Sequence, residues 1–95
     1  MDSPDQLPKA IGKRLQAVRL ANGFEVQAEF ADAIGVGRTV YNAWETGTQR
    51  PGLTAVLRLV DRFSLTLDFI YRGNLASLHE DIRKSIVLQL VKIKA

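Results

Sequence analysis

The feature that most restricts how this chain can fold is a short break, Gly35-Val36-Gly37, between two segments with helical apolar spacing. These segments cover about residues 26–34 and 38–46. A glycine adopts the positive φ that a tight turn requires, and helices joined by so short a turn must cross steeply. A small side chain is needed where they approach, and Ala31 supplies it. The pattern therefore predicts a helix–turn–helix unit.

The second helix of this unit is predicted to have two unlike faces. At about 100° per residue, Val40, Tyr41 and Trp44 share one apolar arc. We expect the two aromatic rings to pack in the core rather than to stack on a nucleic-acid base. The opposite arc is polar and is offered to solvent. It consists of Arg38, Thr39, Asn42 and Thr46.

Apolar spacing predicts three further helices around this unit. One covers residues 8–21, although Gly12 inside it costs about 1 kcal/mol relative to Ala. A fourth helix follows Pro51-Gly52, and a short fifth helix is capped by Thr66 and closed by Gly73. Five helices are thus expected within residues 8–73, and the polar segment 1–7 is expected to be disordered.

The C-terminal extension, residues 74–95, is predicted to add a sixth helix. Ser77 and Glu80 have the spacing of a capping box, in which each side chain satisfies a free backbone amide of the other. The β-branched residues of the segment 86–93 fit a helical stripe or a strand, and we favour the helix. The predicted fold class is therefore all-α, with a possible strand at its end.

The composition excludes most catalytic and metal-binding chemistry. The chain has no Cys, and its single His79 lacks the partners of a zinc site or a Ser/His/Asp relay. Asp68, Glu80 and Asp81 come without a matching nucleophile or metal set. We expect no enzyme activity and no cofactor. Because no apolar run is long enough for a membrane span and no signal peptide is visible, the expected location is cytoplasmic.

The formal net charge of +3 suits an anionic partner but is shared by many proteins that bind no nucleic acid. Within residues 27–50, the basic Arg38 and Arg50 are outnumbered by Glu29, Asp32 and Glu45. Any recognition by this part of the chain must therefore depend on the arrangement of side chains and not on bulk charge.

Several segments in register resemble the Cro and repressor type of helix-turn-helix protein, also called the xenobiotic-response-element family. The resemblance covers about residues 9–73. Its segments are Ile11-Gly12-Lys13-Arg14-Leu15 with Arg19, Gln27-Ala28-Glu29-Phe30-Ala31, Gly35-Val36, Glu45-Thr46-Gly47-Thr48-Gln49-Arg50-Pro51 and Thr66-Leu67-Asp68-Phe69-Ile70-Tyr71-Arg72-Gly73. It implies a five-helix, lambda-repressor-like DNA-binding domain whose third helix enters the major groove.

Carried over by position, the resemblance implies two sets of DNA contacts. The residues that would face the bases are Arg38, Thr39, Asn42 and Ala43. The residues that would contact phosphates are Gln27, Thr46, Gln49 and Arg50. The resemblance also implies a structural ion pair between Arg19 and Glu45, which ties the first helix to the third.

The sequence departs from the family pattern at two places. Residues 23–27 make the approach to the second helix one residue longer than usual, which could shift Gln27 relative to the DNA backbone. Gly37 and Gly52 stand where the family usually carries Ser, so we expect the third and fourth helices to begin without a side-chain cap.

The C-terminal extension predicts a homodimer, because residues 86–91 are apolar nearly all round. The expected contact stripe consists of Ile82, Ile86, Leu90 and Ile93. Helix pairing is the first possibility and strand addition the second. A dimer would place two recognition helices about 34 to 36 Å apart, the spacing that reads a palindromic operator on double-stranded DNA.

The leading interpretation is a sequence-specific, DNA-binding transcriptional regulator, a repressor of phage or bacterial type. Two alternatives stay open. In one, the chain is an antitoxin whose C-terminal segment masks a toxin partner. In the other, the helix–turn–helix unit is a protein-interaction module that no longer binds DNA.

Overall fold

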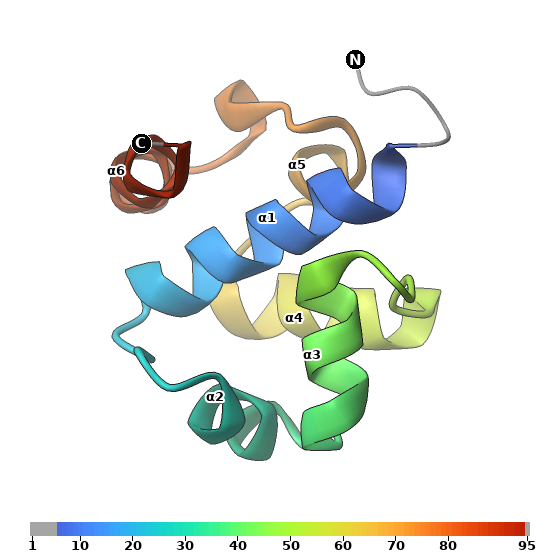
Figure 1. Cartoon of the computed structure of the whole chain (residues 1–95). Coiled ribbons are helices and arrows are strands. Elements are labelled where there is room, and N and C mark those ends of the chain that lie inside the picture. Colours follow the sequence, from blue (N-terminus) through green and yellow to red (C-terminus); the bar gives the residue numbers. More distant parts are fainter. Residues whose placement is uncertain (1–5, 95) are drawn as a thin grey trace.

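The computed structural model describes residues 6–94, which form six α-helices and one short 3-10 helix (Figure 1). In chain order these are α1 (Leu7–Ala21), α2 (Gln27–Ile34), α3 (Arg38–Thr46), α4 (Leu53–Phe63), α5 (Leu67–Arg72), η1 (Leu75–Ser77) and α6 (Glu80–Lys94). The described residues contain no strand, so the predicted all-α class is confirmed. The segment expected to be disordered, residues 1–7, lies outside the described residues except for its end, where Leu7 already begins α1.

The ends of the helices follow local chemistry that the sequence displays. Gly35 ends α2 in the left-handed conformation, with φ 74°, and so makes the tight turn into α3. Thr66 caps α5, because its Oγ1 accepts a hydrogen bond of 2.9 Å from the amide of Phe69. As expected, the N-cap residues of α3 and α4 are Gly37 and Gly52, and neither helix has a side-chain cap.

The predicted capping box at the start of α6 is wrong. Ser77 ends η1, where its hydroxyl donates to the Asn74 carbonyl at 2.7 Å, and α6 begins only at Glu80. The side chain of Asn74 accepts from the amide of Ala76 and so caps η1 three residues earlier. Because this local turn takes up Ser77, its hydroxyl is not available to the amides of α6.

The strand considered for residues 86–93 is also wrong, since the whole of α6 is helical. Ile86 is 1% exposed and belongs to the same core cluster as Leu15 and Phe69. The helical spacing of α6 thus brings one apolar stripe onto the rest of the chain, whereas a strand would turn alternate side chains away from it.

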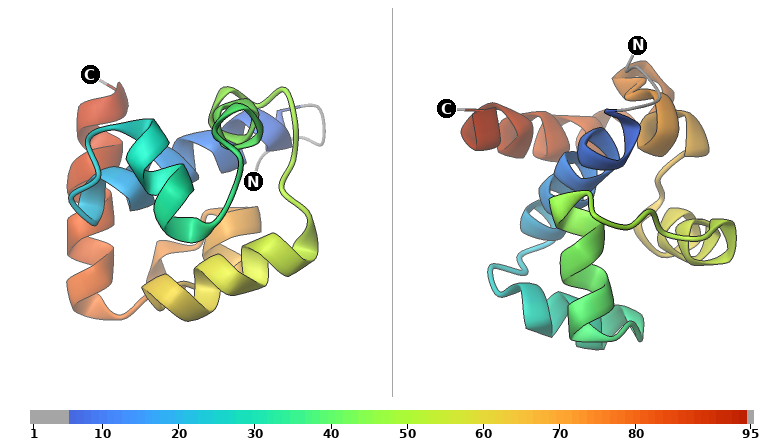
Figure 2. Two further views of the ribbon diagram at one scale, coloured as in Figure 1. Left: turned by 90° about the horizontal axis from the view of Figure 1, so that it is seen from below. Right: turned by 45° about the vertical axis from the view of Figure 1, so that its right-hand side comes forward.

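The helix α1 is the centre of the arrangement (Figures 1 and 2). α2 and α3 lie on one side of it, and α6 crosses it on the other side. Gly12 allows α1 and α3 to approach closely, because a Cβ at this position would lie 2.7 Å from the Trp44 carbonyl oxygen. The glycine that weakens α1 as an isolated helix is therefore required where α1 supports α3.

Candidate nucleic-acid interface

The helix α3 has a buried and an exposed face. Tyr41 is fully buried and Trp44 is 6% exposed, and their rings contact each other with centroids 5.9 Å apart. The ring of Tyr41 also meets that of Phe30 on α2, with centroids 5.3 Å apart. These contacts set the rotation of α3 about its own axis. As a result, the predicted base-facing side chains of Arg38, Thr39 and Asn42 are exposed, and Ala43 is half-buried at the edge of the same face.

The loop after α3 folds back over the end of that helix. The amides of Gly47, Thr48 and Gln49 all donate to the Ala43 carbonyl, at 3.1, 3.0 and 3.2 Å. The hydroxyl of Thr46 donates to the same carbonyl at 3.2 Å. This arrangement holds the loop against α3 and leaves Thr46, Gln49 and Arg50 exposed.

The predicted phosphate contacts come from two elements on either side of α3. Gln27 is the first residue of α2 and is half-buried, whereas Gln49 and Arg50 lie in the loop between α3 and α4. Figures 1 and 2 both place α3 between α2 and this loop. A major groove that receives a helix has a phosphate backbone on each side, so the two sets lie where a duplex could meet both.

At the N-terminal end of α3, Arg38 forms a two-point ion pair with Asp32 of α2. Arg38 Nε donates to Asp32 Oδ1 at 3.1 Å, and Nη2 donates to Oδ2 at 2.6 Å. The two side chains are 67% and 55% exposed. The hydrogen bonds from Arg38 hold the pKa of Asp32 below its ordinary value, and those to Asp32 raise the pKa of Arg38. Both groups are therefore charged at neutral pH.

At the C-terminal end of α3, Glu45 forms a two-point ion pair with Arg19 of α1. Arg19 Nε lies 2.7 Å from Glu45 Oε2, and Nη2 lies 3.2 Å from Oε1. The third nitrogen, Nη1, donates to the carbonyls of Phe24 and Glu25 at 2.8 and 2.9 Å. The side chains of Arg19 and Glu45 are only 7% and 6% exposed. This pair ties α1, the α1–α2 linker and α3 together.

The hydroxyl of Tyr41 is buried close to the same pair. Among the described residues it has no hydrogen-bond partner of acceptable geometry. Burial is the main cause that raises the pKa of Tyr41 far above its ordinary value, and the neighbouring carboxylate of Glu45 raises it further. Tyr41 is thus a neutral core residue and offers no group to a ligand.

The predicted dimer stripe lies on the inner side of α6. Ile86 is buried, and Ile82, Leu90 and Ile93 are half-buried against the core of their own chain. The outer side of α6 carries a different apolar set, in which Val87, Leu88 and Val91 are 36%, 55% and 61% exposed. Among the described apolar side chains of α6, this outer set is therefore the most accessible to a second molecule.

Asp32 is the residue of this surface that sequence reasoning missed. Its signal in the sequence is an acidic residue six positions before Arg38, across a three-residue turn that brings the end of α2 next to the start of α3.

Within residues 6–94, no group of three His, Asp or Glu side chains is placed to bind a metal ion. None of the helices in this range is both long and apolar enough to cross a membrane.

Comparison with known proteins agrees with this geometry. Residues 15–70 match the family described as Helix-turn-helix. Over 70 residues the chain is 30% identical to the SPbeta prophage-derived uncharacterized HTH-type transcriptional regulator YonR of Bacillus subtilis, an alignment that covers 74% of this chain. The chain spans 64% of the length of that relative. No solved structure matches the chain significantly. The family match covers α2, the turn, α3 and more than half of the chain, which therefore belongs to the helix-turn-helix family of the Cro and repressor type.

Proposed function

We propose that this protein is a sequence-specific, double-stranded DNA-binding transcriptional regulator that acts as a repressor. The observation that carries the proposal is the polar, exposed face of α3, whose direction is determined by the buried aromatic face behind it. A helix presented in this way fits the major groove, which is wide enough to admit an α-helix. A regulator that occupies its operator blocks other proteins from the same DNA, so repression requires no further surface.

The exposed face of α3 contains side chains that can distinguish base pairs. The guanidinium of Arg38 can donate two hydrogen bonds to O6 and N7 of guanine, and the amide of Asn42 can pair with N6 and N7 of adenine. The methyl groups of Thr39 and Ala43 can contact the methyl group of thymine. These four residues would carry the sequence preference.

Phosphate contacts from both sides of α3 would fix the register of the helix in the groove. Gln27 lies at the N-terminus of α2, where free backbone amides favour an anion. Thr46, Gln49 and Arg50 lie at the other end of α3 and are exposed. Because only Arg50 among these residues is charged, we expect a shallow salt dependence, since each neutralised phosphate contributes about −0.9 to the slope.

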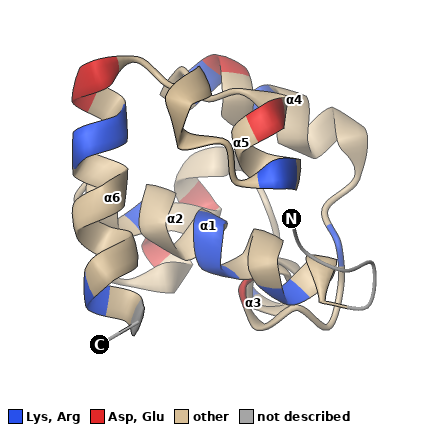
Figure 3. Cartoon of the chain, turned by 90° about the horizontal axis from the view of Figure 1, so that it is seen from above, with Lys and Arg blue, Asp and Glu red and all other residues tan. Residues whose placement is uncertain are grey.

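The outer side of α6 supports a homodimer. Figure 3 shows that α6 carries no charged residue between Lys84 and Lys92. In this interval Leu88 and Val91 are more than half exposed, and Val87 lies beside them. A second copy of the chain would remove these side chains from water. The contact stripe of the proposed dimer is therefore Val87, Leu88 and Val91 rather than the inward-facing stripe expected from the sequence.

A toxin partner is not part of this proposal. The antitoxin alternative assigns the C-terminal segment to masking another protein, but the inner side of α6 already packs across α1 of its own chain. Its inner stripe contributes Ile86 to the common core. The inner side of α6 is thus used for folding the domain itself, and the exposed outer stripe is the part that we assign to a second copy.

Selection of bound sequences from a random duplex pool, at a stated salt concentration near physiological, tests the proposed function. We expect enrichment of a palindromic site with half-sites about 10 bp apart. Arg38→Ala should weaken binding to that site by about 1 to 3 kcal/mol and relax the preference at one base pair. Gln27→Ala should weaken binding to all sequences alike. A folded protein that enriches no sequence would favour the interaction-module alternative.

The mass of the protein in solution tests the dimer. Leu88→Lys places a charge in the outer stripe of α6 and should convert the dimer to a monomer at micromolar concentration. The matched control is Leu57→Lys, because Leu57 is a similarly exposed leucine on α4, at 42% against 55% for Leu88. A monomeric unchanged chain would overturn the dimer, and a monomeric Leu57→Lys variant beside a dimeric Leu88→Lys variant would move the interface to α4.

A further inference from the structure

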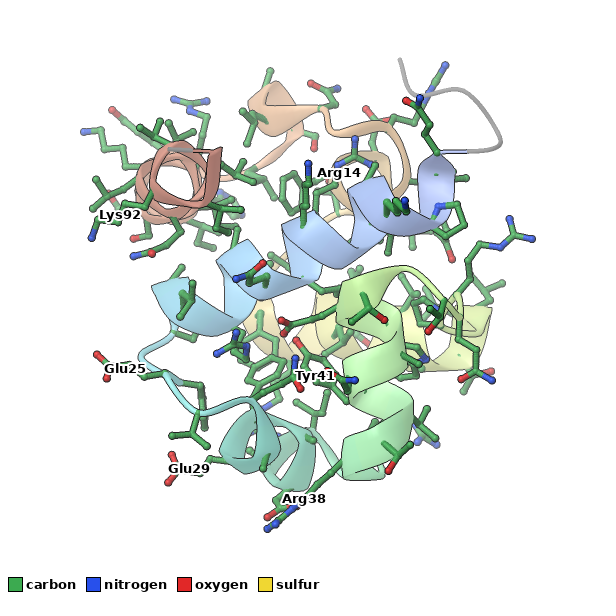
Figure 4. The ribbon with its side chains drawn as sticks, in the orientation of Figure 1. Arg14, Glu25, Glu29, Arg38, Tyr41 and Lys92 are labelled. Carbon is green, nitrogen blue, oxygen red and sulfur yellow. The ribbon has the colours of Figure 1, made fainter. Side chains whose placement is uncertain are left out.

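We propose that Asp32 is a positioning residue that holds the Arg38 guanidinium ready for end-on recognition of guanine, and that Asp32 thereby increases the sequence selectivity of the protein. This inference rests on the proposed function. It concerns a residue outside the base-facing set, on the helix before the recognition helix. Figure 4 shows Arg38 extending from the start of α3 beneath α2, on which Asp32 lies.

The geometry of the ion pair leaves the required donors free. A guanidinium has five N–H groups in a planar fork. Asp32 accepts from Nε at 3.1 Å and from Nη2 at 2.6 Å, which occupies one edge of the plane. The end of the fork, formed by Nη1 and the second hydrogen of Nη2, remains available. This end can donate two parallel hydrogen bonds to O6 and N7 of guanine.

Helix stability does not explain the positions of Asp32 at the end of α2 and Arg38 at the start of α3. Asp32 lies in the last turn of α2, where the negative end of the helix dipole disfavours a carboxylate. Arg38 is the first residue of α3, where the positive end disfavours a cation. An ion pair as exposed as this one also adds little to folding stability. Positioning of a guanidinium at the start of α3 explains both placements.

Positioning would act on selectivity in two ways. A free arginine side chain must lose its rotational freedom when it binds a base, whereas Asp32 already restrains Arg38 before DNA arrives. Because the guanidinium of Arg38 is already paired with a carboxylate, it is also less available to the phosphates of random DNA. Both effects increase the ratio of specific to non-specific affinity.

The test compares Asp32→Asn with the matched control Glu29→Gln. Glu29 is exposed on the same helix, and Figure 4 shows it pointing away from Arg38. Each variant removes one negative charge, but only Asp32→Asn weakens the restraint on Arg38. Dissociation constants are measured for the selected site, for the site with the Arg38-dependent base pair replaced, and for random duplex, all at one salt concentration.

For Asp32→Asn we expect the discrimination at that base pair to fall roughly 2- to 13-fold, which corresponds to the ordering of one long side chain. Glu29→Gln should leave this discrimination unchanged, although both variants should bind random duplex more tightly. In the Arg38→Ala background, Asp32→Asn should not reduce the discrimination further. A merely structural role of Asp32 would instead change the thermal unfolding and would leave the discrimination intact.

Three outcomes would overturn the inference, and they are distinguishable. Unchanged discrimination in Asp32→Asn would remove Asp32 from the recognition machinery. Tighter binding to the selected site with increased discrimination would show that Asp32 competes with guanine for Arg38. If the unchanged chain shows no preference for any sequence, the proposed function fails, and the inference fails with it.

Discussion

Two arginine–carboxylate pairs lie at opposite ends of α3, and they differ mainly in their exposure to water. In the pair Arg19–Glu45 the side chains are 7% and 6% exposed, whereas in the pair Arg38–Asp32 they are 67% and 55% exposed. Both pairs make two hydrogen bonds between guanidinium and carboxylate. The buried pair thus fixes one end of α3 to the rest of the chain, whereas the exposed pair leaves an arginine accessible at the other end.

The difference follows from what surrounds each pair. Around Arg19, the carbonyls of Phe24 and Glu25 accept the remaining Nη1 donor, so little of the guanidinium is left for another partner. Around Arg38, the end of the guanidinium is left to solvent. A buried pair loses much of its attraction to desolvation but becomes indispensable once formed, because either partner alone would be an uncompensated buried charge.

The largest expected effect is on the buried pair. Glu45→Ala should lower the free energy of unfolding by about 3 to 5 kcal/mol, because it leaves Arg19 buried without a counter-charge. Urea unfolding followed by circular dichroism measures this loss. A loss below about 1 kcal/mol would mean that water reaches Arg19 easily, and the contrast between the two pairs would then disappear.

The support of α3 by α1 can be disturbed without changing any charge. Gly12→Ala should destabilise the protein by about 1 to 3 kcal/mol, because the added Cβ would lie 2.7 Å from the Trp44 carbonyl oxygen. This effect opposes the gain of about 1 kcal/mol that Ala brings to an isolated helix. Lys13→Ala, at an exposed position of the same helix, is the control in urea unfolding. A more stable Gly12→Ala variant would contradict the close approach.

The sequence predicts the bounds of the helices better than it predicts the contacts between them. The flanking glycines, Gly37 and Gly47, are local signals that predict a helix from Arg38 to Thr46, and α3 has these bounds. The spacing of Ser77 and Glu80 predicts a cap for α6, but Asn74 caps η1 in the same stretch of backbone and so places Ser77 at the end of η1. A local pattern cannot decide between two such caps.

Contacts between elements were harder to predict than the elements. The spacing of α6 identifies an apolar stripe, but it does not say whether that stripe covers the same chain or a second copy. In the structure the stripe that contains Ile86 covers α1. Arg38 pairs with Asp32 because the turn between α2 and α3 brings the two residues together. The usual rule for ion pairs, a spacing of three or four residues along one helix, does not predict a pair between two helices.

Alkaline pH tests the environment of the buried pair through Tyr41. Burial raises the pKa of Tyr41, so above pH 10 the unfolded chain loses this proton while the folded chain keeps it. Stability should therefore be unaffected below about pH 10 and should fall by about 1.4 kcal/mol per pH unit above it. Urea unfolding between about pH 8 and pH 11 measures how the free energy of unfolding changes with pH. This range spans the ordinary tyrosine pKa of about 10. Tyr41→Phe should remove this contribution, whereas Tyr71→Phe, which leaves Tyr41 in place, should retain it.

The smallest expected effect is on the folding stability contributed by the exposed pair. Asp32→Ala should change the free energy of unfolding by less than about 0.5 kcal/mol, because an exposed ion pair gains little in water and because Asp32 lies at the unfavourable end of α2. The same urea experiment measures Asp32→Ala and Glu45→Ala. Each variant removes the carboxylate of a two-point pair at one end of α3, so the exposure of the pair is the main difference between them. A loss of 2 kcal/mol or more would make Arg38–Asp32 a structural clamp between α2 and α3. A small loss combined with reduced base discrimination would instead separate the two roles, with Glu45 required for the fold and Asp32 for recognition.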